Sequence, residues 1–166
     1  MKRIAFVRSR YLNRSETFIY EELIHIRRYR AIVYARIKRN LKRFPYPYIK
    51  RLKNNPKKMA RRFKRDRIRL IHARFGTAGV KLIKVKKRLG LPMITSFHGF
   101  DLPMRRQKKK TYHRRLSKLF KAGDKFTVPS KQMKRLLIRW GCPSSKIVVM
   151  YSGIDPKKFP YINRAK

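Results

Sequence analysis

Short apolar runs alternate with longer amphipathic segments along the chain. Six runs have the length of a strand and are rich in β-branched or aromatic residues; they lie within 3–7, 31–37, 67–75, 92–99, 124–130 and 146–153. Runs that are apolar at successive positions are typical of strands buried on both faces of a parallel sheet. The pattern therefore predicts about six buried strands.

The segments between these runs carry apolar residues three and four positions apart, which is the spacing of one helix face. Helices are predicted over residues 15–26, 77–89, 105–121 and 130–140. Ser15 and Ser130 are expected to cap the first and last of them, and Gly90 and Gly141 follow two helices as C-terminal stops. Each predicted strand is thus separated from the next by a helix or a loop.

Residues 38–65 fit neither pattern. This stretch mixes aromatic residues with many cations, and Pro45, Pro47 and Pro56 interrupt any long helix. We expect an irregular basic arm that contains some short helical pieces.

The alternation of strands and helices favours an α/β fold. Right-handed crossovers between parallel strands place helices on both faces of the sheet, so we expect a Rossmann-like parallel sheet of about six strands in one domain over residues 1–160. Ligands of such sheets bind beyond the carboxyl ends of the strands. The polar residues that leave the predicted strands at this rim are Arg8–Ser15, Arg74–Gly76, His98–Asp101, Pro129–Ser130 and Ser152–Asp155.

The charge balance adds a class of partner. Lys and Arg number 49 against 7 Asp and Glu, which gives a net charge of +42. Such a chain attracts polyanions, including nucleic acid, anionic lipid and phosphorylated sugars, and charge alone does not choose among them. The apolar runs are too short for a signal-peptide core or a membrane span, so we expect a cytoplasmic protein, soluble or peripheral at the membrane.

Several familiar site types find no support in the sequence. It contains neither G-x-G-x-x-G nor G-x-x-x-x-G-K-[ST], the usual glycine-rich phosphate loops. With one cysteine, Cys142, and four scattered histidines, we expect no metal site.

Four stretches, in order and spacing, resemble a known family. They are "SRYLNRSETFIYEEL", "IHARFGTAGV", "LGLPMITSFHGFDL" and the long segment from "AGDKFTVPSKQ" to "YSGIDPKKF". Together they resemble the N-terminal domain of the GT4-type glycosyltransferases, which have the GT-B fold, from about residue 3 to 159 with a weak patch at 38–65. The strongly cationic surface of this chain, with a net charge of +42, departs from that family.

The resemblance implies the acceptor-binding half of a two-domain enzyme of polysaccharide biosynthesis. Such an enzyme moves a sugar from a nucleotide-sugar donor, here a UDP- or GDP-sugar, to a saccharide or lipid-linked acceptor. It usually retains the anomeric configuration and needs no obligatory metal. The chain stops about ten residues after "YSGID", where the family crosses to the donor domain. We therefore expect that the donor domain is absent, that no cofactor is bound by this domain, and that the fragment is inactive without a donor domain or partner chain.

His98 is the predicted catalytic residue, because the resemblance places it beside the transferred sugar. A neutral imidazole can hydrogen-bond a sugar hydroxyl or a phosphate, although a histidine at the end of a strand can equally be satisfied by backbone. Gly99 would let the backbone approach the acceptor closely. Asp101 either contacts the acceptor, orients His98 or caps the following helix.

Other site residues follow from the same resemblance. Arg10, Ser15 and Glu16 lie in the acceptor loop, where the arginine would bind a phosphate and the other two either contact acceptor or simply cap a helix. The residues expected at the cleft between the two domains are Ser130, Ser152, Gly153 and Asp155.

The basic segments 38–65 and 105–121 allow two interpretations. A basic amphipathic helix suits an anionic membrane surface, and aromatic residues among cations suit stacking on RNA bases. The resemblance favours the membrane, and no RNA-binding signature is present. The alternative function is a catalytically inactive module that binds polyanions such as RNA through its +42 surface.

Overall fold

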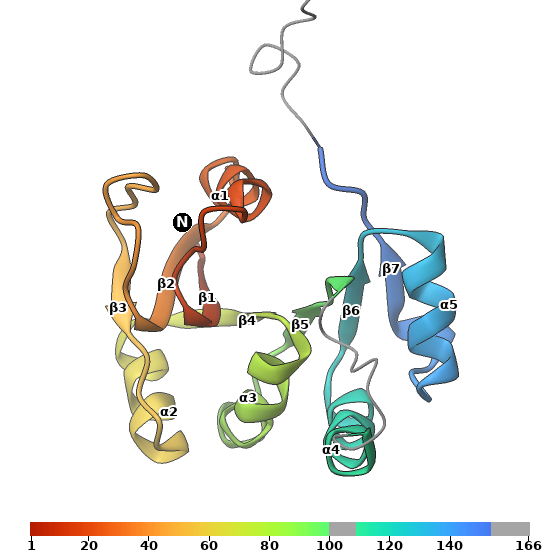
Figure 1. The fold of residues 1–166 in the computed structure, drawn as a ribbon. Coiled ribbons are helices and arrows are strands. Elements are labelled where there is room, and N and C mark those ends of the chain that lie inside the picture. Colours follow the sequence, from red (N-terminus) through yellow and green to blue (C-terminus); the bar gives the residue numbers. More distant parts are fainter. Residues whose placement is uncertain (100–108, 154–166) are drawn as a thin grey trace, which may run out of the picture.

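A computed structural model describes residues 1–99 and 109–153 of the chain (Figure 1). In this part, seven strands form one fully parallel sheet in the order β3-β2-β1-β4-β5-β6-β7. The strands are β1 Arg3–Arg10, β2 Arg30–Ile37, β3 Ile49–Arg51, β4 Ile68–Arg74, β5 Met93–Ser96, β6 Lys125–Val128 and β7 Ile147–Val149. The predicted α/β fold is confirmed, with seven strands where about six were expected.

Five α-helices lie between the strands in the described ranges 1–99 and 109–153. They are α1 Thr17–Ile24, α2 Pro56–Arg65, α3 Gly76–Leu89, α4 Lys109–Ala122 and α5 Lys131–Arg139. Helices α2, α3, α4 and α5 pack on one face of the sheet, where they share the larger apolar core with inward residues such as Val7 and Ile71. Helix α1 packs on the other face, with a smaller core that includes Phe6 and Phe44.

The additional strand lies in the segment that was predicted to be irregular. Within 38–65, β3 pairs with β2 at the edge of the sheet, and α2 follows it directly. Asn55 caps α2 by accepting from the backbone N–H groups of Lys57 and Lys58, and Pro56 occupies the first turn, where a missing N–H costs nothing. Residues 38–65 thus contain one short strand and one helix between irregular stretches, and Pro56 begins that helix instead of breaking it.

The ends of the helices follow the sequence signals in three of four cases. Ser130 caps α5 by accepting from the Met133 backbone N–H at 3.1 Å. Gly90 ends α3 with a left-handed φ of 62°, and Gly141 follows α5 with a φ of 86°. Ser15 does not cap α1: Glu16 stands at that position, and its side chain makes no capping hydrogen bond.

The strand order reverses beside β1. From β1 the chain passes through α1 to β2 on one side, whereas β4 to β7 extend the sheet on the other side. In open parallel sheets, a crevice forms outside the carboxyl ends of the strands at such a switch point. This places the candidate site near the ends of β1, β4 and β5.

Candidate functional site

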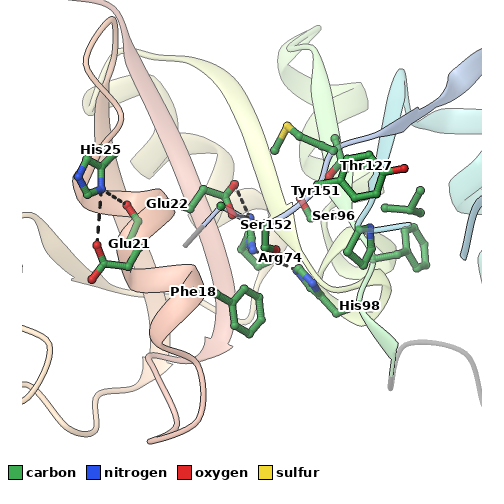
Figure 2. Close-up of a pocket in the computed structure, with 15 residues that line it drawn as sticks. Phe18, Glu21, Glu22, His25, Arg74, Ser96, His98, Thr127, Tyr151 and Ser152 are labelled. Atoms are coloured by element: carbon green, nitrogen blue, oxygen red, sulfur yellow. Dashed lines mark hydrogen bonds and ion pairs between the residues drawn. The ribbon is translucent and has the colours of Figure 1, made fainter. Parts of the chain in front are cut away.

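A pocket of about 340 Å³ lies at the carboxyl ends of β4, β5 and β6, and residues of α1 form one of its walls (Figure 2). Its lining residues are Phe18, Glu21, Glu22, His25, Arg74, Ser96–His98, Thr127–Pro129 and Met150–Gly153. The volume falls within the range of small-molecule binding sites. The rim predicted from the strand ends is therefore hollowed at this point.

Arg74 is the central charged group of the pocket. Its side chain is 1% exposed, and its Nη1 donates to both carboxylate oxygens of Glu22 on α1 at 2.6 Å. Its guanidinium also lies over the ring of Phe6, 5.3 Å from the ring centroid. A buried cation is tolerated only when it is paired in this way, so α1 and β4 are held together by the requirement to neutralise Arg74.

His98 takes part in the same network (Figure 2). Arg74 Nη2 lies 3.0 Å from His98 Nε2, and because a guanidinium only donates, Nε2 must be the accepting nitrogen of a neutral imidazole. Burial, together with the positive charges of Arg74 and Arg8, lowers the His98 pKa to about 4. The ring is therefore uncharged at neutral pH and carries its proton on Nδ1.

Aromatic rings fix the position of the His98 imidazole. The rings of Phe18 and Phe75 each have a centroid 5.2 Å from that of His98. Phe75 adopts a φ of 74°, a left-handed conformation that is rare for a bulky residue. Such a backbone costs on the order of 1–3 kcal/mol and occurs preferentially at functional sites. Here it places the Phe75 ring against both His98 and Arg8, whose guanidinium lies 5.2 Å from the ring centroid.

A second polar network supports the floor of the pocket. The Thr127 hydroxyl donates to Ser96 Oγ at 2.7 Å, and Ser96 Oγ lies 2.7 Å from His72 Nε2. Ser96 and Thr127 line the pocket, whereas His72 is buried behind them. Burial, with Arg74 and His98 nearby, lowers the His72 pKa to about 3. His72 therefore acts as a neutral hydrogen-bond partner that orients Ser96.

The depressed pKa of His72 makes stability depend on pH. Between about pH 6.5 and 3 the unfolded chain binds a proton at this residue that the folded chain excludes, so stability must fall as the pH falls. Between pH 7 and pH 5 we expect this residue to reduce the free energy of unfolding by about 2 kcal/mol. Urea unfolding of the wild type and of His72→Gln at both pH values measures this change in the free energy of unfolding. Equal pH dependence in the two proteins would contradict the assignment.

Comparison with known proteins identifies the family. A model of Glycosyltransferase Family 4 matches residues 12–158, a range that contains every residue lining the pocket. The chain belongs to this family. The predicted resemblance to the N-terminal domain of GT4-type, GT-B-fold enzymes is thereby confirmed.

Among curated proteins, the Amylovoran biosynthesis glycosyltransferase AmsK of Erwinia amylovora is 37% identical over 95 residues, which are 54% of this chain and 22% of AmsK. Among solved structures, Anabaena HepE in complex with UDP matches with a TM-score of 0.79 at 17% identity, over 98% of this chain and 47% of HepE. A glycosyltransferase from Rickettsia africae matches with a TM-score of 0.70 at 19% identity, over 95% of this chain and 45% of its own.

These structural likenesses show the fold that this family member shares with them. The chain spans less than a quarter of AmsK and about half of each of the two solved structures.

The structure brings three of the sequence-predicted site residues together. His98, Ser152 and Gly153 all line the pocket, although they come from segments more than fifty residues apart in the chain. Gly99 follows His98 on the exposed surface, and a Cβ built on it would meet no atom within 4 Å. Close backbone packing therefore does not require glycine there. Asp101 and Asp155 lie outside the described residues.

Glu16, predicted to contact the acceptor or to cap a helix, forms an ion pair with a buried arginine. Its carboxylate binds Arg8 Nη2 through both oxygens, at 2.8 and 2.7 Å, and also accepts from the Asn13 backbone N–H at 2.7 Å. Arg8 is 4% exposed, so this pair neutralises a second buried cation. The carboxylate has little capacity left for a ligand.

The remaining predicted residues lie away from the pocket. Arg10 at the end of β1 and Ser15 in the turn before α1 are exposed, and neither lines the pocket. Ser130 also lies outside the lining and uses its hydroxyl to cap α5. An interdomain role for Ser130 would have to come from its backbone or from the rotation of its side chain away from the helix.

Sequence reasoning missed the residues that hold His98. Arg74 was placed only among the residues of the rim, and neither Glu22 nor Phe18 was predicted to belong to the site. One signal was present: an arginine at the end of an otherwise apolar strand, where burial demands a carboxylate partner. No group of three or more potential metal ligands occurs in the described ranges 1–99 and 109–153.

Proposed function

We propose that this chain is the acceptor-side half of a glycosyltransferase that transfers a sugar from a nucleotide-sugar donor to a saccharide or lipid-linked acceptor. The observation that carries the proposal is the neutral His98, held by buried Arg74 in a pocket that Ser152 and Gly153 also line. Membership of Glycosyltransferase Family 4 supports it.

The geometry gives each group a task in this reaction. The neutral imidazole would hydrogen-bond a hydroxyl of the sugar. Arg74 prevents protonation of Nε2 by its own charge, so the ring keeps one tautomer across the physiological pH range. Ser96 and Thr127, oriented by His72, would contact further hydroxyls.

The nucleotide-sugar donor would be bound by a second domain. HepE was solved in complex with UDP and with UDP-glucose, and we infer a UDP- or GDP-sugar for this protein. The sugar would be held by a donor-binding domain on the same or a partner chain and transferred with retention of configuration, without a metal. The isolated chain would then be inactive.

The test is an assay of label transfer. The chain joined to the donor-binding domain of a family member is incubated with labelled UDP- and GDP-hexoses and with a bacterial lipid extract or oligosaccharides as acceptors. We expect incorporation by the joined protein and none by the chain alone. No incorporation from either nucleotide class, with the joined protein folded, would contradict the proposed function.

A second proposal concerns the place where the enzyme works: the cytoplasmic face of an anionic membrane. Helices α2, α3 and α4 lie side by side on one face of the sheet (Figure 1), and none of their residues is acidic. Their exposed cations include Lys58, Arg61, Lys84, Lys87, Arg114 and Lys118. Helices long and apolar enough to cross a bilayer are not found in the described residues. The charged helix surface supports peripheral attachment.

Vesicle binding distinguishes this face from the rest of the surface. We expect Arg61→Glu with Lys84→Glu to weaken binding to phosphatidylglycerol vesicles by at least about tenfold, because each cation near such a surface contributes about 1 kcal/mol. The matched control, Arg39→Glu with Lys42→Glu, changes the same charge on the α1 side of the sheet. Sedimentation with the vesicles measures both. Equal loss in both variants would instead favour diffuse polyanion binding, of which RNA binding is the alternative function.

A further inference from the structure

A second pocket, of about 330 Å³, opens between α2 and α3 at the carboxyl ends of β1 and β2. In Figure 1 these two helices lie next to each other beneath the sheet, on the face opposite α1. This α2–α3 pocket shares no lining residue with the pocket around His98. It is therefore a separate site, which the proposed transfer reaction does not use.

The floor of the α2–α3 pocket is apolar. It is made by side chains of the larger core and of the segment before α2, namely Leu52, Met59, Ala78, Leu82 and Val85. Four of these five are buried and Leu52 is half-buried, so their positions are fixed by the surrounding packing. Such a floor favours a hydrocarbon chain. Three polar residues, Arg8, Ser9 and Asn54, also line the pocket, and the Arg8 charge is already paired with Glu16.

The rim of the same pocket is cationic. Arg36 from β2, Lys53 from the loop before α2 and Lys81 from α3 line it, and all three are exposed. No Asp or Glu is among the described residues that line the pocket, and no ion pair found in the described ranges involves any of the three cations. Three elements thus bring positive charge to one opening without neutralising it.

We propose that the α2–α3 pocket binds a single-chain amphiphile with a phosphate head, such as a long-chain alkyl phosphate. The hydrocarbon chain lies along the apolar floor, and the phosphate lies among the three rim cations. A phosphate suits this rim because its oxygens can accept from several cations at once. The N-terminus of α2 makes no contribution, since Asn55 already accepts from the N–H groups of Lys57 and Lys58.

The experiment needs a readout confined to this pocket, because an anionic surfactant will also bind loosely to a chain of net charge +42. Methionine methyl groups provide one. Met59 lines the α2–α3 pocket, Met150 lines the pocket around His98, and Met133 lines neither. The methyl signals of ¹³C-labelled methionine are followed by NMR while dodecyl phosphate is added below its micelle concentration.

We expect the Met59 signal to shift and saturate at one equivalent while the Met133 and Met150 signals stay in place. Butyl phosphate, which keeps the head but shortens the chain, should bind at least about tenfold more weakly. Dodecyl maltoside, which keeps the chain but removes the charge, should not saturate the Met59 shift in the same range.

A matched pair of lysine variants tests the rim. Lys81 on α3 lies at the pocket, whereas Lys131 on α5 is exposed and outside the lining. We expect Lys81→Gln to weaken dodecyl phosphate binding about fivefold, and Lys131→Gln to leave it unchanged. Equal effects of the two variants, or shifts of all three methionines together, would overturn the proposal and indicate nonspecific surfactant binding only.

Discussion

Replacement of His98 by alanine is expected to reduce glycosyl transfer by the joined, two-domain enzyme at least about a hundredfold. The imidazole is a preorganised donor, held by Arg74 and by the rings of Phe18 and Phe75. A donor fixed in this way stabilises charge in the transition state without reorganisation, so its loss should lower kcat more than it raises KM.

His25→Ala is the matched control for this experiment. His25 lines the same pocket at the end of α1, but its side chain is 60% exposed. Its loss should change kcat less than about threefold. Circular dichroism shows whether both variants remain folded. Full activity of folded His98→Ala would refute the assignment of His98 as the catalytic residue.

The second large effect is expected on stability, from Glu22→Gln. This change keeps the shape of the side chain but removes the negative charge that pairs with Arg74, which is 1% exposed. Loss of one partner of a buried ion pair costs about 3–5 kcal/mol. The Glu22 side chain is 28% exposed, so water partly screens the pair, as it does in exposed ion pairs. We therefore expect the free energy of unfolding to fall by a smaller amount, about 2 kcal/mol.

Glu21→Gln, one position earlier on α1, is the control. The Glu21 carboxylate lies 3.8 Å from Nδ1 of His25, whose side chain is 60% exposed, so we expect the free energy of unfolding to fall by about 0.5 kcal/mol, as for an exposed pair. Urea unfolding compares the two variants with the wild type. A Glu22→Gln protein no less stable than Glu21→Gln would show that Arg74 does not depend on its carboxylate.

Much of the fold was predictable from local sequence. Buried parallel strands require runs of apolar residues such as that of β1. Because all strands run in the same direction, the residues that follow them, including His98 and Ser152, lie at the same edge of the sheet. Strand β3 was missed because its three residues, Ile-Lys-Arg, contain no apolar run, and only pairing with β2 makes them a strand.

The network within the site was not predictable in the same way. Glu22 and Arg74 are 52 residues apart, and the chain contains 49 cations, so no local pattern selects this partner. Glu16 illustrates the same limit. Its position before a helix is consistent with a cap or an acceptor contact, and only the burial of Arg8 decides that it forms an ion pair.

Arg74 also has a consequence for how ligands act on one another. Its Nη1 holds helix α1 through Glu22, and its Nη2 holds His98, so one rigid planar group joins two walls of the pocket. A ligand that binds α1 and shifts it will change the binding free energy of a second ligand at His98. By thermodynamic linkage, the ligand at His98 changes the binding free energy of the first by the same amount. If the acceptor binds along α1 and the sugar at His98, as proposed, the two binding events are thermodynamically linked through the single buried side chain of Arg74.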